Sequence, residues 1–223
     1  MIKKLIFLLS LFLFFQCSIN EKNGFEKIPS THSNILFNNI LVENDSINIL
    51  DNEFFYNGAG LALGDFNNDS LVDVFFAGNQ VNNKMYLNKG NLVFEDVTDI
   101  SNLNKSDNLI WSSGVNVIDI NNDNLQDIYV CNTLRKDSNL RKNMLYINLG
   151  VNENGIPVFE NQAEKYGLAD STYSSHAQFF DYDNDGDLDL FVGVNRIEGI
   201  DPNVFRNIHD DNKVLSIDKL YEN

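Results

Sequence analysis

Three short acidic loops share one spacing of oxygen-bearing side chains, and this repetition constrains the fold more than any other feature of the sequence. Each loop has Asp at positions 1, 5 and 9 and Asp or Asn at position 3, between two apolar runs. The loops begin at Asp65, Asp119 and Asp181. Their separation exceeds the roughly 40 to 50 residues of a four-stranded propeller blade by only a short insertion. We therefore expect at least three copies of one structural unit.

Each copy predicts four β-strands. An apolar strand precedes the acidic loop and a second one follows it; a Tyr-Asn strand and a Phe-Glu strand come next. The Tyr-Asn strand is expected at 83–88 and 143–148, with a weaker echo at 203–207. In the strand before the loop, alternate residues such as Leu61 and Leu63 are expected on the better-buried face. A single sheet cannot bury both of its faces, so the units are expected to stack. The predicted fold class is all-β, a β-propeller of four-stranded blades, with about three blades of an incomplete ring.

The loops have the chemistry of a calcium site. Ca²⁺ takes six to eight hard oxygen ligands, from carboxylates, amide oxygens, backbone carbonyls and water. A tight turn that places oxygens at positions 1, 3, 5 and 9, with the backbone carbonyl of position 7, can surround one ion. The predicted ligands, for up to three Ca²⁺ sites, are Asp65, Asn67, Asp69, Leu71 and Asp73; Asp119, Asn121, Asp123, Leu125 and Asp127; and Asp181, Asp183, Asp185, Asp187 and Asp189.

Two other structures share part of this loop pattern. An EF-hand shares the opening of the loop but needs Glu at position 12, where this chain has Phe76, Val130 and Val192. A metal-free Asp/Asn-rich surface turn is possible for one loop, but three matched loops would crowd carboxylates that repel one another. Position 6 favours a positive φ, which Gly186 adopts more easily than Asn124 or Ser70. The third loop is therefore expected to bind most tightly and the first most weakly.

The N-terminus indicates a processing segment. The uncharged apolar run 5–15 follows two lysines; it has the length of a signal peptide and is too short for a transmembrane helix. Cys17 comes next, as in bacterial lipoprotein signals, where the cysteine becomes the lipidated first residue. Gln16 and Phe14 depart from the usual lipobox, so a secreted or uncleaved form stays open. We expect an exported protein, an outer-membrane or cell-surface lipoprotein or otherwise periplasmic or secreted, with membrane contact only through the lipid anchor.

Charge and cysteine content exclude some functions. The formal net charge is −16, whereas nucleic-acid binders neutralise phosphates with clustered Lys and Arg, so no nucleic-acid partner is expected. Besides Cys17 only Cys131 exists, in an apolar strand pattern, so it is expected to be a buried thiol. A chain whose Cys17 is lipidated cannot form an intramolecular disulfide, which leaves metal loops as a source of rigidity.

These motifs resemble the FG-GAP/VCBS repeat family, the integrin-α-like repeats of many exported bacterial proteins. The stretch 56–69, with Asn88-Lys-Gly90 and Phe94-Glu-Asp-Val-Thr98, is similar to the first blade of such proteins, notably those with a C-terminal ASPIC/UnbV domain. The resemblance implies a propeller, usually seven-bladed, with calcium in the blade loops and a role in adhesion or ligand binding. The expected organisation is a signal peptide at 1–17, an N-terminal segment at 18–55 and incomplete repeats at 56–223, namely about 56–105, 110–168 and 172–223.

The leading functional hypothesis is a non-enzymatic, calcium-binding adhesion or ligand-binding module at the cell surface, with an unidentified protein or polysaccharide as partner. The alternative is the propeller portion of a carbohydrate-active enzyme such as a polysaccharide lyase. The sequence has no H-E-x-x-H or G-x-S-x-G motif. A basic loop at 133–143 is expected to be a solvated insertion, or else a grip for an acidic glycan. His176 is expected to be structural or to lie near a propeller axis, and Trp111 to be core or a sugar platform.

Overall fold

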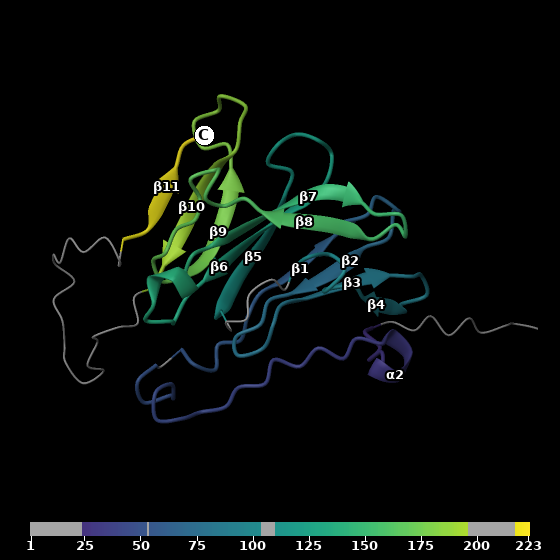
Figure 1. Ribbon diagram of the computed structural model, residues 1–223, viewed down its shortest axis with the longest axis horizontal. Helices are drawn as coiled ribbons and strands as arrows, with labels where there is room; N and C mark the ends of the chain where they lie inside the picture. Colours follow the sequence, from purple (N-terminus) through teal and green to yellow (C-terminus); the bar gives the residue numbers. More distant parts are fainter. Residues whose placement is uncertain (1–23, 53, 104–109, 196–216) are drawn as a thin grey trace, which may run out of the picture.

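The computed structural model describes residues 24–52, 54–103, 110–195 and 217–223, and nearly all of its regular structure is β (Figure 1). The strands form three antiparallel sheets, in the orders β1-β2-β3-β4, β5-β6-β7-β8 and β11-β10-β9. The all-β class and the four strands per unit are thereby confirmed for the first two sheets. The strands are β1 Leu61–Gly64, β2 Asp73–Phe76, β3 Lys84–Asn88, β4 Phe94–Asp96, β5 Ser112–Ile118, β6 Asp127–Asn132, β7 Met144–Val151, β8 Pro157–Asn161, β9 Ser174–Phe180, β10 Asp189–Val194 and β11 Lys219–Tyr221.

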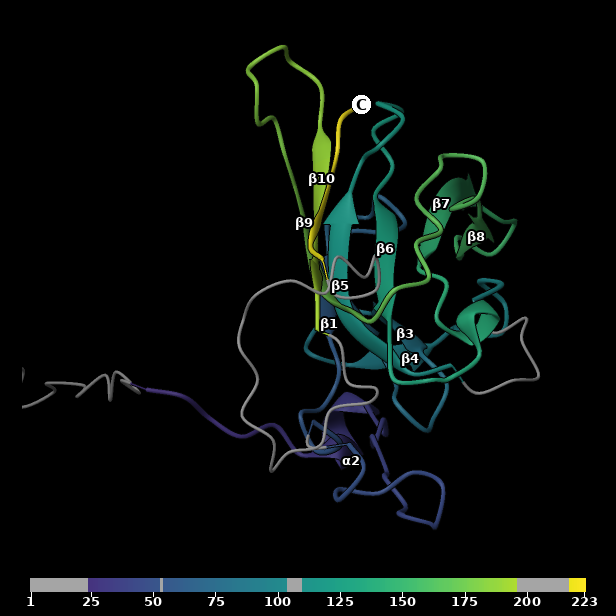
Figure 2. The same cartoon turned by 90° about the vertical axis from the view of Figure 1, so that its left-hand side faces the viewer.

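Each sheet is a meander in which strands that follow one another in the sequence are neighbours. The acidic loops are the first hairpin connection of each sheet, between β1 and β2, β5 and β6, and β9 and β10. Figure 2 shows the second and third sheets side by side, with the β5–β6 and β9–β10 loops projecting from the same end. The repeated loop sequence therefore occupies the same position in each of the three sheets.

Two apolar layers hold the sheets face to face. The first lies between the first and second sheets and includes the fully buried side chains of Phe75, Met85, Ile128 and Phe159. The second lies between the second and third sheets and is built around Tyr129, whose ring meets Phe179 edge to face at 5.6 Å. Burial of a large apolar side chain contributes about 1.5 to 3 kcal/mol, so these layers are the main cohesive term of the stack. The buried free thiol of Cys131 lies in the second layer, as predicted.

The strand register shows that the three sheets are equivalent residue by residue. Tyr86 pairs with Val74 in the first sheet, Tyr146 with Ile128 in the second, and Tyr221 with Leu190 in the third. The Tyr-Asn strand of the third unit is therefore β11. The weaker echo expected at 203–207 lies outside the described residues.

The first sheet also departs from the predicted pattern of burial. Leu61 and Leu63 are 54% and 58% exposed, whereas Ala62 between them is buried against the second sheet. The predicted alternation is correct in β9, where Ala177 is buried and Gln178 is exposed. The reason for the difference is positional, because Leu61 and Leu63 face away from the second sheet and no described sheet covers that face.

The described N-terminal segment packs along the first sheet. It contains one short helix, α2 (Ser30–Ser33). Phe37 stacks on Phe76 with 4.7 Å between ring centroids, and Asn39 exchanges two hydrogen bonds with Asn79. Phe55 is fully buried, 5.4 Å from the ring of Trp111 in the second unit. The segment thereby joins two units. Among the described residues no helix is long and apolar enough to cross a membrane.

Candidate metal centre

The three acidic loops have the same backbone turn. Position 6 has a positive φ in each, at Ser70 (68°), Asn124 (65°) and Gly186 (99°), as predicted. Position 4 does so as well, at Asn68, Asn122 and Asn184. Asn tolerates this left-handed region better than other residues with a side chain, which is a signal that the sequence analysis missed. Two left-handed residues within nine bend the loop around its own first carboxylate.

The first aspartate of each loop accepts hydrogen bonds from the turn that surrounds it. The backbone N–H of Asp69 donates to one oxygen of Asp65 at 3.0 Å and that of Ser70 to the other at 2.8 Å. Asp119 accepts the equivalent pair from Asp123 and Asn124 at 3.1 and 2.9 Å. In the third loop Asp181 accepts from Asn184 and Gly186. The first ligand position is therefore oriented before any ion is bound.

The ninth aspartate of each loop is buried inside the sheet. Asp73, Asp127 and Asp189 are at most 1% exposed. One oxygen of each accepts the N–H of loop position 2, at 3.0 to 3.1 Å. The other accepts an N–H from the third strand in the first two units, as from Asn148 at 2.7 Å for Asp127, and from Asn223, two residues beyond β11, in the third. Because burial penalises the charged form, the pKa of Asp73 and of Asp127 is raised to about 6.

The third loop brings three carboxylates together. Asp181, Asp183 and Asp189 each offer one oxygen, and these atoms lie within 4.8 Å of one another. Desolvation and the nearby charge of Asp185 raise the pKa of Asp183. A hydrogen bond with Asp185 and desolvation raise the pKa of Asp187, whose Oδ1 is buried with no hydrogen-bond partner. A hard divalent cation fits this donor set, because it would neutralise the repulsion and take oxygen ligands.

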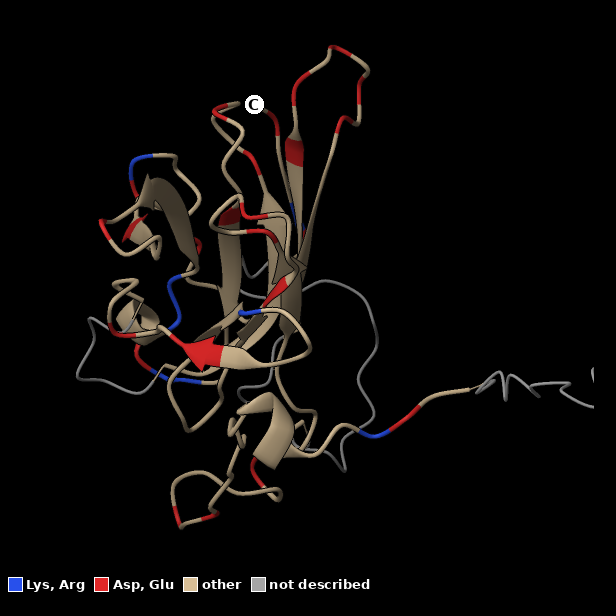
Figure 3. Cartoon of the chain, turned by 90° about the vertical axis from the view of Figure 1, so that its right-hand side faces the viewer, with Lys and Arg blue, Asp and Glu red and all other residues tan. Residues whose placement is uncertain are grey.

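The first two loops differ from the third at position 3. The amide Nδ2 of Asn67 donates to Asp69 at 2.9 Å, and that of Asn121 donates to Asp123 at 2.8 Å. These bonds relieve within the loop the repulsion that Asp183 and Asp185 leave unrelieved in the third. Figure 3 shows the acidic loops at the ends of the β5–β6 and β9–β10 hairpins. Ligation by position 5, and by the position 7 carbonyls of Leu71, Leu125 and Asp187, stays a prediction.

The basic loop at 133–143 is organised from within. Arg141 is only 4% exposed; its guanidinium donates to the carbonyls of Arg135, Lys136 and Ser171 and lies 4.2 Å from the ring centroid of Tyr173. A guanidinium with these partners cannot also grip a glycan. Arg141 is therefore the buried centre of the loop, which corrects the expectation of a solvated insertion at this residue.

Two other residues of interest have structural surroundings. Trp111 is 3% exposed and packs on Phe55 and Leu134, so no ring face is open as a platform for a sugar. His176 is exposed, and a Cβ on Gly193 would lie 2.7 Å from its imidazole ring. At the equivalent positions, a Cβ on Gly60 or Gly114 would approach the backbone of the next sheet to within 2.6 Å. Glycine at these two positions permits a close approach of successive sheets, and at Gly114 that approach is to the backbone of His176 itself.

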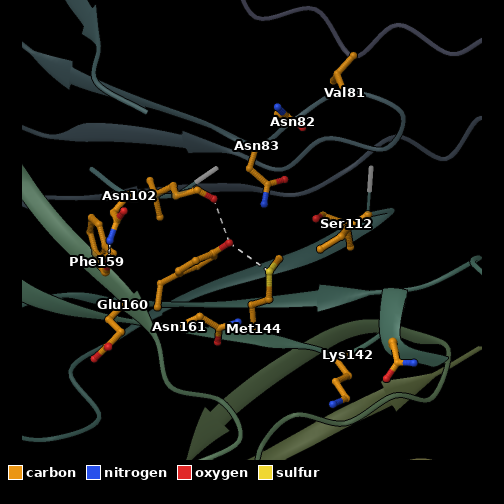
Figure 4. Close-up of a pocket in the computed structure, with 14 residues that line it drawn as sticks. Val81, Asn82, Asn83, Asn102, Ser112, Lys142, Met144, Phe159, Glu160 and Asn161 are labelled. Carbon is orange, nitrogen blue, oxygen red and sulfur yellow. Dashed lines mark hydrogen bonds between the residues drawn. The ribbon is translucent and has the colours of Figure 1, made fainter. Parts of the chain in front are cut away.

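A cavity of about 410 Å³ opens between the first and second units. Figure 4 shows Asn83, Asn102 and Asn161 around it. Tyr146 also lines the cavity, and its hydroxyl donates a hydrogen bond to the carbonyl of Leu103. Leu103 and Ile110 line the cavity on either side of residues 104–109, which lie outside the described part. The described lining combines five asparagines with six apolar or aromatic side chains, and Lys142 and Glu160 are its charged groups.

One comparison with known proteins bears on this site. A family model described as an FG-GAP-like repeat matches residues 65–130. The match begins at the first residue of the first acidic loop and ends inside β6, so it includes both of the first two loops. No curated protein matches the chain. The lipidation residue predicted in the signal segment, Cys17, lies outside the described residues. Together, the repeated sheets and the matched segment support an FG-GAP repeat protein.

Proposed function

We propose that this chain is a calcium-stabilised repeat module for adhesion or ligand binding, exported to the cell surface and without catalytic activity. The observation that carries the proposal is the convergence of Asp181, Asp183 and Asp189 within 4.8 Å, in a loop whose turn recurs twice more. Hard oxygen donors, like charges and a preformed turn are together the requirements of a calcium loop. An FG-GAP repeat suggests the adhesive or ligand-binding class.

The proposed site would stabilise the hairpin that carries it. In the third loop Asp181, Asp183, Asp185 and Asp189 and the carbonyl of Asp187 would hold the ion, which supplies charge neutralisation and a crosslink between β9 and β10. The same positions serve in the first two loops, so that each sheet has one crosslink on its first hairpin. These loops would stabilise the sheets. The proposed partner is a protein or a polysaccharide that binds to the stabilised sheets. A similarity to VCBS proteins with ASPIC/UnbV domains belongs to the same proposal.

Export rests on the sequence of the first residues. The proposed signal ends at Cys17, whose thiol would carry the lipid and anchor the protein at the outer membrane or cell surface. Metabolic labelling with a fatty-acid analogue tests this directly: label that survives Cys17→Ala refutes lipidation at this residue.

The test of calcium binding is thermal unfolding with excess calcium and with a chelator. At a calcium concentration one hundred times Kd, one site adds about 2.7 kcal/mol, or roughly 5 to 11 °C in Tm for a domain of this size. Asp183→Ala should reduce the gain, whereas Asp99→Asn, which removes an exposed acid outside the loops, should leave it unchanged. Equal Tm values with calcium and chelator would refute the proposal.

A second pair of assays addresses the absence of catalysis. The calcium-loaded protein is incubated with acidic polysaccharides, and the appearance of new reducing ends or unsaturated products is followed. The same preparation is applied to a glycan array. Binding without product formation is the expected result, and product formation that depends on the protein would replace the proposal with the enzymatic alternative.

A further inference from the structure

Hydrogen bonds join the first acidic loop to the second. The backbone N–H of Asp65, the first residue of the first loop, donates to Oε1 of Gln126 at 2.7 Å. Gln126 occupies position 8 of the second loop, next to the buried Asp127. A side-chain contact therefore connects the first predicted ligand of one loop to the ligand-bearing end of the next.

Asn148 adds a second connection between the same loops. Its backbone N–H donates to Asp127 at 2.7 Å, and its side-chain Nδ2 donates to the carbonyl of Phe66 in the first loop at 2.8 Å. Nδ2 is also 3.3 Å from the carbonyl of Gln126. The side chain is 1% exposed, so water does not compete for these bonds. Asn148 thus fixes the position of Phe66, the second residue of the first loop, relative to Asp127, the ninth residue of the second loop.

The second and third loops lack such connections. Within the described residues no hydrogen bond joins 119–127 to 181–189. The reason is visible in the sequence: Leu188 occupies the position of Gln126 and has no acceptor. Gly64, against which Gln126 lies, is replaced by Ile118 in the second unit. A Cβ on Gly64 would be 2.3 Å from Oε1 of Gln126, so the glycine and the glutamine form a matched pair.

We infer that Gln126 and Asn148 couple the first two acidic loops, so that ion binding at one favours binding at the other, while the third loop binds independently. The inference rests on the calcium binding proposed above and adds its regulation. Ligation at the second loop would fix Asp127 and the adjoining Gln126. The fixed Oε1 then holds the Asp65 amide and with it the turn of the first loop. Two sites that order one shared element lower each other's ordering cost, which is positive coupling.

Isothermal titration with calcium tests the coupling in protein whose third loop is disabled by Asp183→Ala. Asp69→Ala or Asp123→Ala then leaves a single active loop. The product of the two binding constants in the two-loop protein should exceed the product of the single-loop constants by at least about 5-fold, the lower end for an allosteric coupling. Gln126→Leu, which copies the third loop, should abolish the excess, and Gln126→Glu, which keeps an acceptor, should retain it. The second and third loops, titrated together with the first disabled, should show no excess.

The outcomes separate the two proposals. Calcium binding with no excess in the two-loop protein overturns the coupling alone, and an excess that Gln126→Leu leaves unchanged overturns the role of Gln126. Absence of calcium binding in every protein overturns the proposed function and the coupling together. Amide hydrogen exchange gives a readout that needs no substitution at Gln126. In Asp69→Ala protein, calcium at the second loop should slow exchange at Asp65 at least about 5-fold, and an unchanged rate would contradict the coupling.

Discussion

Gly114→Ala should destabilise the fold, although Gly193→Ala, an identical change in a strand of the next sheet, should not. A Cβ on Gly114 would lie 2.6 Å from Cα of His176 and 2.9 Å from the carbonyl oxygen of Ser175, both backbone atoms of β9. A Cβ on Gly193 would meet only the ring of His176, an exposed side chain that can turn away. Overpacking against backbone costs about 1 to 3 kcal/mol, whereas Gly to Ala at a tolerant site gains about 0.4 to 1 kcal/mol.

For a chain of this length 1 kcal/mol corresponds to roughly 2 to 4 °C in Tm, so Gly114→Ala should lower Tm by about 2 to 12 °C. Thermal unfolding followed by circular dichroism in chelator measures both variants without any contribution from ions. A second substitution sharpens the comparison: His176→Ala should relieve any residual cost of Gly193→Ala and leave that of Gly114→Ala unchanged, because the latter clash is with backbone. Gly114→Ala at wild-type Tm, or rescued by His176→Ala, would refute the backbone-to-backbone approach of the two sheets.

The remaining predictions concern three buried polar groups. Burial acts to raise the pKa of Asp170, but hydrogen bonds, first among them the one from Lys219, lower this pKa below its ordinary value. The ionised carboxylate therefore stabilises the fold above about pH 3.8, and this stabilisation is lost as pH falls through the lowered pKa. Urea unfolding should therefore show Asp170→Asn destabilised by about 1.5 to 3 kcal/mol at pH 7 and by less at pH 3, and a constant difference would contradict the ion pair. Arg141→Lys should lose at least about 1.5 kcal/mol, because an ammonium cannot reproduce the fork of bonds to separate carbonyls; wild-type unfolding would exclude that role. Asp127→Ala should destabilise by about 1 to 3 kcal/mol even in chelator. Asp123→Ala, whose exposed carboxylate accepts bonds only within its own loop, should destabilise more in calcium than in chelator; equal behaviour of the two variants would remove the distinction between them.

The repeated loops and the strands around them could be predicted because local chemistry decides them. Asp and Asn at alternate positions, with Gly186 or Asn124 at the sharpest point, select a turn whatever lies nearby. The apolar runs on either side have strand propensity and length, so β1 and β2 or β5 and β6 follow from the loop between them. The left-handed backbone at position 4 follows from the same reasoning, because Asn occurs there in all three loops.

Three features of the fold were not predicted from the sequence. Leu61 and Leu63 have the pattern of a buried face, and their exposure follows only from the absence of a described sheet on that side. The position of β11 did not follow from the repeat spacing, because the connection before this strand is longer than in the other units. Gln126 has no local signal at all: its partner is 61 residues away and its room is provided by Gly64. Packing between units therefore determines the first and the last of these features, and the length of a connection within one unit determines the second.

The ninth aspartate unites the fold and the proposed metal site. In all three units both of its oxygens accept backbone N–H groups, one from the loop and one from the third strand or, at Asn223, from just beyond it. A buried carboxylate that accepts two such bonds still has lone pairs for a cation, and an ion beside it would offset the burial that raises the pKa of Asp73 and Asp127. The sheet therefore pays part of the ordering cost of the site, and the ion would in turn relieve an electrostatic cost of the sheet. This reciprocity explains why an acidic loop of fixed spacing recurs with the strands rather than apart from them.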